Sequence, residues 1–387
     1  MGKSFWVKAG FLIFSVVLAL VVAEVGLRIF TPEPVNLAKL KSSSLFLFEN
    51  KPNAVFGRNS GEYNVDITIN SSGFRDTEFS EDKPSGVFRM AVIGDSQTEA
   101  SQVKLEDTWE KVMVRRLGEV TGKKIETYSF GVSGYGTDQE WLTLREKVWM
   151  FKPNLVVLAF SPNDVGDVYK NGLVKLNGNG EIEVTTEAQR AGGNFLGKAA
   201  RETYLYHLFV QALSGSDFGK RVVNKVRVKI LGFPKDDKFF LSDAQLVQGP
   251  FEVIASQKNP PKEVLNTWQV VKTLILDMKK QADGHGSGFM ITICIPRAQV
   301  DIGDWDKLVE QYKIDAGNSS PHEINDVLVQ FAQENEIPIY DMREDANAWK
   351  QENGILHFPL DGHFNVNGNK FMGTKMADFV ADKKLLP

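Results

Sequence analysis

Four short segments of the chain carry residues that could act together in nucleophilic catalysis. Ser96 follows the apolar run of "MAVIGDSQTEA", and Asp361 and His363 lie in "DGHFN" near the C-terminus. A serine hydroxyl becomes an effective nucleophile when a base such as histidine takes its proton. A neighbouring carboxylate can fix the histidine tautomer and stabilise the imidazolium that forms. These residue types predict Ser96 as the nucleophile, His363 as the base and Asp361 as the partner of the base.

The other two segments offer donors for the negative charge that such chemistry develops. Gly134 lies in "GVSGYG" and Asn163 lies in "SPND". A tetrahedral oxyanion needs preorganised N–H groups, such as the backbone N–H groups of Ser96 and Gly134 and the side-chain amide of Asn163. Gly134 suits this role because a residue without a side chain allows the backbone to approach a substrate. We therefore predict an oxyanion hole formed by Ser96, Gly134 and Asn163.

Each segment also has a simpler structural interpretation. A Gly-Asp-Ser turn before a helix is typical of a cap, formed here by Asp95 or Ser96. His357, in "ILHFP", is a rival base that lacks a neighbouring acid. Ser133 lies in "GVSGY", which starts like the Gly-x-Ser-x-Gly elbow of α/β-hydrolases but has tyrosine at the fifth position. The joint occurrence of the four segments, three of them directly after predicted strands, favours the catalytic interpretation.

Alternating strands and helices must position these residues. From residue 87 onward, apolar runs typical of buried parallel strands alternate with amphipathic helical patterns. The predicted strands are residues 87–95, 124–131, 154–160, 288–296 and 337–342. This alternation predicts an α/β protein, a three-layer α/β/α sandwich with a mainly parallel sheet. In such sheets, sites form beyond the carboxyl ends of the strands, where Ser96, Gly134 and Asn163 lie.

After residues 1–30, the chain is predicted to contain an extension and the α/β domain, which includes an insertion. Residues 31–85 are predicted to be a linker and a small β-containing extension, in which "EYNVDITIN" alternates like a strand. Residues 86–387 are predicted to form the α/β domain. The regular alternation lapses at about residues 165–261, which we interpret as an insertion that shapes the acyl or alcohol pocket.

Residues 1–30 contain a stretch apolar enough to enter a membrane. Residues 9–23 carry no charge, and Lys3 and Lys8 precede them. With residues 5–7 they would form a helix of about 28 Å, close to the thickness of a hydrocarbon core. A signal-anchor helix with its basic end in the cytoplasm is predicted, and a secretory signal cleaved near Ala23 is the alternative. Both interpretations export the rest of the chain.

The composition argues against several other functions. A net charge of −4 over 387 residues gives no sign of nucleic-acid binding. The single cysteine, Cys294, excludes an intramolecular disulfide and a cysteine-based metal site, and it lies in an apolar run typical of a core. We predict no metal and no cofactor. The expected partners are an ester substrate and a membrane, and the oligomeric state stays open.

Together, "GDSQT", "GVSG", "SPND" and "DGHFN" resemble the four blocks of the SGNH, or GDSL-type, hydrolases in the family's own order. The resemblance runs from about residue 87 to the C-terminus, apart from residues 165–261. "INSSGFRD" and the N-terminal apolar helix also resemble those of membrane-anchored bacterial members. The resemblance implies a flavodoxin-like sandwich and metal-independent ester chemistry. It also implies a nucleophile, a base and two oxyanion donors at Ser96, His363, Gly134 and Asn163.

Two positions depart from the pattern of that family. The asparagine block is usually Gly-x-Asn-Asp, but Ser161 stands in place of the glycine. The last block is commonly Asp-x-x-His, whereas a single residue separates Asp361 from His363. The shorter spacing resembles that of related enzymes that handle acetyl groups on polysaccharides. If Asp361 cannot reach the ring nitrogen, His363 would rely on a backbone carbonyl and act with Ser96 as a dyad.

The expected function is a serine ester hydrolase, more specifically a carbohydrate O-acyl (acetyl) esterase of the cell envelope. The same acyl-enzyme could pass its acyl group to a sugar hydroxyl, so an O-acyltransferase that modifies an envelope polysaccharide is an alternative. A non-catalytic envelope protein that binds a glycan is a third possibility. Water is the default acceptor because a transferase must exclude it from the site.

Overall fold

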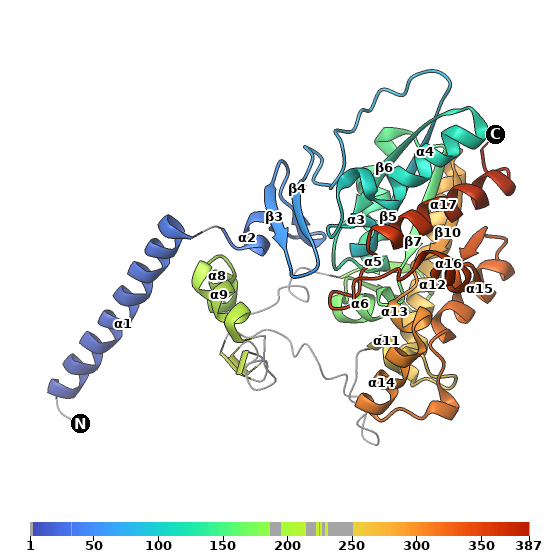
Figure 1. Cartoon of the computed structure of the whole chain (residues 1–387). Coiled ribbons are helices and arrows are strands. Elements are labelled where there is room, and N and C mark those ends of the chain that lie inside the picture. The colour runs from blue at the N-terminus through green and yellow to red at the C-terminus, as the bar shows by residue number, and fades with distance from the viewer. Residues whose placement is uncertain are drawn as a thin grey trace. The chain divides into compact units, whose positions relative to one another are not determined.

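The computed structural model describes residues 3–31, 33–185, 195–213, 222–223, 225–226, 229–230 and 251–386 (Figure 1). The chain divides into two compact units. The helical unit contains Met1–Lys41 and Ala191–Asp236, and the α/β unit contains Ser42–Arg190 and Asp237–Pro387. All the predicted site residues belong to the α/β unit.

A sheet of five parallel strands forms the centre of the α/β unit (Figure 1). Its strands are β5 (Val87–Gly94), β6 (Lys124–Gly131), β7 (Leu155–Phe160), β10 (Gly288–Ile293) and β11 (Ile339–Asp341). They lie in the order β11-β10-β7-β5-β6. Numbered along the chain from β5, this is the 2-1-3-4-5 order of flavodoxin-like sheets, in which ligands bind where the order reverses, between β5 and β7.

Both faces of this sheet are covered at its centre, which is why the central strands β5, β7 and β10 are mostly apolar. All the residues of β7 are buried. Along β5, Val92 belongs to the hydrophobic cluster on one face, whereas Ile93 belongs to the cluster on the other face. Successive side chains of a strand point to opposite faces, so each strand contributes to two separate cores. Cys294 is buried in the cluster that contains Val92, as predicted.

Helices cover the two faces and complete the three layers. On the face that contains Val92, the cluster includes side chains of α4 (Trp109–Thr121), α16 (Arg343–Asn353) and α17 (Val366–Asp382). The opposite face is covered by α5 (Thr137–Thr143), α6 (Asp164–Asn171), α11 (Phe251–Ala255), α12 (Lys262–Gly284) and α15 (Glu323–Glu334). The unit also contains the helices α3 (Ser96–Glu99), α13 (Arg297–Val300) and α14 (Ile302–Tyr312). The predicted α/β/α sandwich is confirmed.

Small two-stranded sheets accompany the main sheet. β3 (Val55–Asn59) and β4 (Asn64–Thr68) form an antiparallel hairpin, which we call the extension hairpin. The strand predicted in "EYNVDITIN" corresponds to β4. The other pairs are β1 (Leu40–Ser43) with β2 (Leu47–Asn50), and β8 (Val174–Leu176) with β9 (Ile182–Val184).

Two side chains of the segment "INSSGFRD" form hydrogen bonds with the loop after β5 and with β6. Arg75 is 3% exposed, and its guanidinium donates hydrogen bonds to backbone carbonyls at and beyond the end of α3, those of Glu99, Ala100 and Val103. The Asp76 carboxylate accepts the N–H of Ser129 on β6 at 2.9 Å. An arginine offers five N–H donors in a rigid fork, so one side chain can bind several carbonyls. These bonds hold α3, whose first residue is the predicted nucleophile.

The helical unit contains α1 (Lys3–Phe30), α2 (Val35–Lys39), α8 (Phe195–Arg201) and α9 (Tyr204–Leu213). Glu24 links α1 to α9, because its carboxylate accepts the N–H groups of Tyr204 and Leu205, both at 3.0 Å. Arg28 lies over the ring of Tyr204. The first N–H groups of a helix have no intrahelical partner, so Glu24 serves as a cap for α9.

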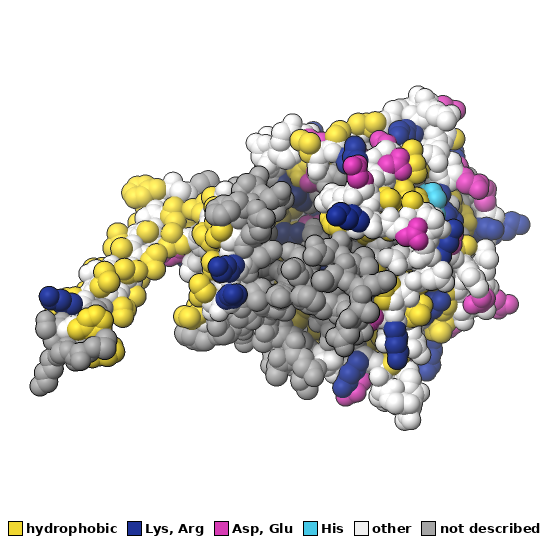
Figure 2. Space-filling view, turned by 90° about the horizontal axis from the view of Figure 1, so that it is seen from below, with side chains coloured by type: hydrophobic (Ala, Val, Ile, Leu, Met, Phe, Trp, Pro, Cys, Tyr) yellow, Lys and Arg dark blue, Asp and Glu magenta, His cyan; other side chains and the backbone are white. Residues whose placement is uncertain are grey.

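Hydrophobic side chains cover the face of α1 that is visible in Figure 2. By length and composition, the 26 residues Phe5–Phe30 could cross a membrane, a property that a signal sequence would share. A helix of that length extends about 39 Å, more than the roughly 30 Å of a hydrocarbon core. The predicted apolar N-terminal helix is therefore present, and it continues without a break beyond Ala23.

The predicted insertion is divided between the two units. Within it, α6, β8, β9 and α11 belong to the α/β unit, whereas α8 and α9 belong to the helical unit. That the insertion shapes the acyl or alcohol pocket stays a prediction.

Candidate active site

Ser96 is presented at the carboxyl end of β5 by a sharp turn into α3. Asp95 precedes the helix, and its Oδ1 accepts the backbone N–H of Gln97 at 2.9 Å. This bond makes Asp95 the cap of α3, since a cap side chain accepts an N–H from the first turn. The Ser96 hydroxyl is not part of this cap, and its contact with Asp95 is a long one of 3.4 Å to Oδ2. Asp95 itself is 1% exposed, as expected for a structural acid.

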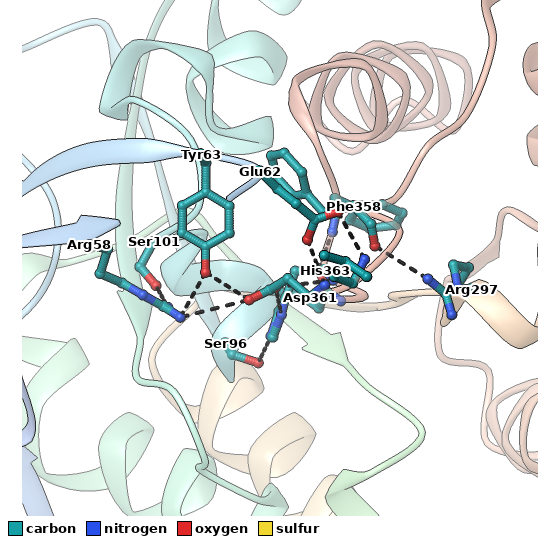
Figure 3. A network of polar contacts seen from close by, with 12 residues as sticks. Arg58, Glu62, Tyr63, Ser96, Ser101, Arg297, Phe358, Asp361 and His363 are labelled. Atoms are coloured by element: carbon teal, nitrogen blue, oxygen red, sulfur yellow. Dashed lines mark hydrogen bonds and ion pairs between the residues drawn. The ribbon is translucent and has the colours of Figure 1, made fainter. Parts of the chain in front are cut away.

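The structure brings Ser96, His363 and Asp361 together (Figure 3). His363 Nε2 lies 2.8 Å from Ser96 Oγ, and His363 Nδ1 lies 2.5 Å from Asp361 Oδ1. A carboxylate can only accept, so the Nδ1 atom carries the ring proton in the neutral imidazole. Nε2 then has a free lone pair that accepts the Ser96 hydroxyl. A serine, a base and an orienting acid in this order can perform nucleophilic acyl transfer.

The residue between Asp361 and His363 allows their side chains to meet despite the short Asp-x-His spacing. Gly362 has a φ of +84°, in the left-handed region that favours glycine. Its N–H bonds to the carbonyl of Phe358 at 2.9 Å, and the N–H of Phe358 bonds to the carbonyl of His363 at 2.9 Å. This tight turn lets the side chains of Asp361 and His363 meet. Asp361 therefore reaches the ring nitrogen, and the dyad alternative is not needed to explain the geometry.

The Gly362→Ala variant is expected to lose both stability and activity. A Cβ at this position would meet no atom within 4 Å, so the penalty comes from the backbone. A left-handed conformation costs a non-glycine residue about 1–2 kcal/mol. We expect a lower Tm and a lower kcat. Gly122→Ala is the matched control, since Gly122 has a φ of +66° and equally open space at the C-cap of α4. Its Tm should fall while its activity is retained; equal loss of activity in both variants would contradict this role for the turn.

Both N–H groups of the Asn163 amide already have hydrogen-bond acceptors. Its Nδ2 donates to Asp95 Oδ2 at 3.2 Å and to Asp167 Oδ2 at 3.0 Å. An amide nitrogen has two N–H groups, so both are directed at carboxylates. Burial raises the pKa of Asp167, and the hydrogen bond from Asn163 opposes that rise. An oxyanion could be bound only if one of these carboxylates were displaced.

Gly134 follows β6 and lies on the same edge of the sheet as Ser96 and Asn163. Its φ of +84° is in the left-handed region, and its backbone is exposed. Among the described residues, no hydrogen bond to the N–H of Gly134 or of Ser96 is observed. These two N–H groups are thus available to a ligand. That they form a single oxyanion hole with Asn163 stays a prediction.

Ser161, which departs from the family pattern, contributes a hydrogen bond of its own. Its Oγ donates to Asp95 Oδ1 at 2.9 Å, so it binds the residue that caps α3. The carboxylate of Asp164, the first residue of α6, accepts the N–H of Ser161 at 2.9 Å. Burial, with the nearby charge of Glu140, raises the pKa of Asp164 well above its usual range. The serine thus joins β7 to the nucleophile turn.

The two rival residues have other roles in the structure. His357 is 3% exposed, its Nε2 lies 2.9 Å from the carbonyl of Ile295, and its ring stacks on Phe364. Burial lowers the pKa of His357 to about 4, so it stays neutral in the core. The backbone N–H of Ser133 donates to Glu99 Oε2 at 2.6 Å, and no partner of its hydroxyl is observed within the described ranges. Among the described residues, neither the Ser133 hydroxyl nor the His357 ring is paired with a catalytic partner.

The structure adds residues that the sequence analysis did not select. Tyr63 and Glu62, in the turn of the extension hairpin, contact Asp361 (Figure 3). Burial would raise the pKa of Asp361, but hydrogen bonds from His363 and Tyr63 lower it below its usual range. Asp361 is therefore a carboxylate at neutral pH. The polar turn "NSGEY" carries no signal that would have linked it to a loop about 300 positions later.

Comparison with known proteins adds a likeness of fold. No protein-family model and no curated protein matches the sequence. Similar solved structures include an acetyl xylan esterase, with 15% identity and a TM-score of 0.37 over 76% of this chain and 99% of that chain. A catalytic mutant of the acetylxylan esterase Axe2 from Geobacillus stearothermophilus has 12% identity and a TM-score of 0.40 over 76% and 94%. A GDSL-like lipase from Bacteroides thetaiotaomicron has 12% identity and a TM-score of 0.32 over 76% and 88%.

These solved structures are distant from this chain in sequence, at 12% to 15% identity. Their identities and TM-scores are too low to assign an activity to this chain. Any functional assignment therefore rests on the geometry of Ser96, His363 and Asp361.

Proposed function

We propose that the chain is a serine esterase of the SGNH type. The observation that carries the proposal is the contact of His363 with both Ser96 and Asp361. In the first step, Ser96 Oγ attacks the ester carbonyl while His363 Nε2 takes the hydroxyl proton. The tetrahedral intermediate collapses when His363 returns that proton to the leaving alcohol, and the acyl group stays on Ser96.

The second step releases the acyl group. A water molecule gives a proton to His363 and attacks the acyl-enzyme, and the histidine then protonates Ser96 as the carboxylic acid leaves. Asp361 stabilises the imidazolium in both steps because its carboxylate faces Nδ1. The backbone N–H groups of Ser96 and Gly134 supply oxyanion donors, since neither has another hydrogen-bond partner in the part of the chain that the structure describes.

Asn163→Ala tests the third oxyanion donor. If the amide exchanges one of its carboxylate partners for the oxyanion, kcat should fall by about 10²–10³-fold with little change in KM. Asn171→Ala is the matched control, since Asn171 is the last residue of α6, the helix that Asn163 precedes, and its amide donates to Asp138 and Gln139. The control should retain kcat. An unchanged kcat in Asn163→Ala would restrict the oxyanion hole to the two backbone groups.

The proposed substrate is an O-acylated, most simply O-acetylated, carbohydrate of the cell envelope. Two observations support it. The Asp361–His363 spacing resembles that of acetyl-handling relatives, and α1 could hold the chain at a membrane, where surface polymers are assembled. Acyl transfer to a sugar hydroxyl would use the same acyl-enzyme and is the alternative outcome of the test.

The test uses the full chain in detergent. Chromogenic p-nitrophenyl esters of increasing acyl length measure the chain-length preference, with Ser96→Ala as the blank. We expect the acetyl ester to be cleaved fastest. An acetyl donor is then supplied with and without a candidate glycan. If acetyl-glycan accumulates faster than acetate, the proposed activity would be acyl transfer and not hydrolysis. If the chain neither cleaves any of these esters nor reacts with a fluorophosphonate probe, the result would favour a non-catalytic glycan-binding protein.

We further propose that α1 is a signal anchor that leaves the α/β unit outside the cytoplasm. Lys3 and Lys8 favour a cytoplasmic N-terminus. A reporter fused after the last residue should be active only on the outer side of the membrane, and an active cytoplasmic reporter would contradict this orientation. Release of a soluble chain shortened near Ala23 would instead support a cleaved signal.

A further inference from the structure

The turn of the extension hairpin lies against the loop that carries Asp361 and His363. The hydroxyl of Tyr63 donates to Asp361 Oδ2 at 2.7 Å, while Asp361 Oδ1 faces His363 (Figure 3). Each oxygen of the carboxylate thus has its own partner. The ring of Tyr63 packs on Phe358, with centroids 5.1 Å apart. Tyr63 therefore holds Asp361 in the rotamer that faces the histidine.

Glu62 binds the backbone of the same loop. Its two carboxylate oxygens accept the N–H groups of Leu360 and Asp361, each at 2.8 Å. Charge-assisted hydrogen bonds are short and strong, so a carboxylate that accepts two adjacent N–H groups restricts the motion of the backbone between them. Glu62 thus holds the backbone of Asp361, and Tyr63 holds its side chain.

Arg58 connects this pair to the segment that carries the nucleophile. On β3, its Nη2 donates to the hydroxyl of Tyr63 at 3.0 Å and lies 3.8 Å from Asp361 Oδ2. Its Nη1 donates to Ser101, which follows α3 (Figure 3). The hairpin therefore contacts both the acid loop and the end of the segment that begins with Ser96.

We propose that Tyr63 and Glu62 are positioning residues, which keep Asp361 directed at His363 and so set the reactivity of Ser96. This inference rests on the proposed function. It assigns to the extension hairpin a role in catalysis rather than in folding alone. Burial and the hydrogen bond to Asp361 raise the pKa of Tyr63, so its hydroxyl keeps the proton that it donates.

The test variant is Tyr63→Phe, which keeps the ring against Phe358 and removes only the hydroxyl. The readout is the rate at which Ser96 in the full chain reacts with a fluorophosphonate probe, since this reaction needs an activated serine but no knowledge of the natural ester. We expect a decrease of roughly 10-fold, the lower end of what a hydrogen bond to a charged group contributes. With p-nitrophenyl acetate, the decrease should appear in kcat and not in KM.

Two comparisons separate positioning from a general structural role. Tyr340→Phe removes a similar bond, since the Tyr340 hydroxyl donates to Asp345 Oδ2 at 2.6 Å on a different part of the unit. It should leave the labelling rate unchanged. In an Asp361→Ala background, Tyr63→Phe should cause no further decrease, because its effect passes through Asp361. Glu62→Ala should also slow labelling at an unchanged Tm.

The outcomes distinguish the inference from the proposed function. If the wild type labels at Ser96 and Tyr63→Phe labels equally fast, the inference is wrong and the proposed function stands. An additional decrease in the Asp361→Ala background would show a structural role and overturn the inference as well. If the wild type does not label, the proposed function fails, and the inference fails with it.

Discussion

The Ser96→Ala variant is expected to lose ester cleavage by about 10⁶-fold while keeping its fold. The hydroxyl removed is the group 2.8 Å from His363 Nε2, and no other described nucleophile is bound to that histidine. The fold should survive because Asp95, and not Ser96, caps α3. The measurements are kcat on p-nitrophenyl acetate and Tm. A variant that keeps a large part of its kcat would remove Ser96 from the mechanism.

The His363→Ala variant should lose as much activity as Ser96→Ala, and the double variant should be no worse. The two residues act as one unit, so their losses are not additive. Ser133→Ala is the matched serine control and should remain active, since the Ser133 contact to Glu99 uses only the backbone N–H. Additive losses, or an inactive Ser133→Ala, would contradict the assignment.

Asp361→Asn is expected to lower kcat by about 10⁴-fold, the effect of leaving a catalytic histidine in the wrong tautomer. An asparagine at this position could donate to His363 Nδ1. The ring proton would then move to Nε2, the atom that must accept from Ser96. The 2.5 Å contact between Asp361 and His363 is the reason to expect so large an effect.

The matched control for that variant is Asp345→Asn. Asp345 also accepts a tyrosine hydroxyl and pairs with Lys375 at 2.7 Å, but it lies on α16 and contacts no residue of the site. Its kcat should stay near that of the wild type. If Asp361→Asn also kept most of its kcat, His363 would be oriented by another group and Asp361 would be a structural residue.

The fold and the three residues at the centre of the site were predictable from the sequence. Parallel strands covered on both sides are mostly apolar, so β7 was visible as an unbroken apolar run and β5 as a run interrupted only by Arg89. The polar residues that end those runs must lie at one edge of the sheet. No periodic pattern could have distinguished His363 from His357, but the neighbouring acid Asp361 favoured His363, and the resemblance to a known family agreed with that choice.

The support around that centre was not predictable. Tyr63 contacts Asp361 across 298 positions, and the contact depends on how the extension hairpin packs. The engagement of Asn163 by Asp95 and Asp167 depends on the register of β5 against β7 and on the start of α6. Such contacts depend on tertiary packing, and the local sequence pattern of these segments does not predict them.

The bonds between α1 and α9 have a practical consequence for preparing the protein. A chain shortened to begin near residue 31 would lose Glu24, which accepts the first N–H groups of α9, and Arg28, which lies over the ring of Tyr204. The apolar helix "YLYHLFVQAL" would then remain without its cap, so we expect such a chain to aggregate during purification. Removing residues 191–236 together with α1, and bridging the gap with a short polar linker, should instead yield a soluble α/β unit.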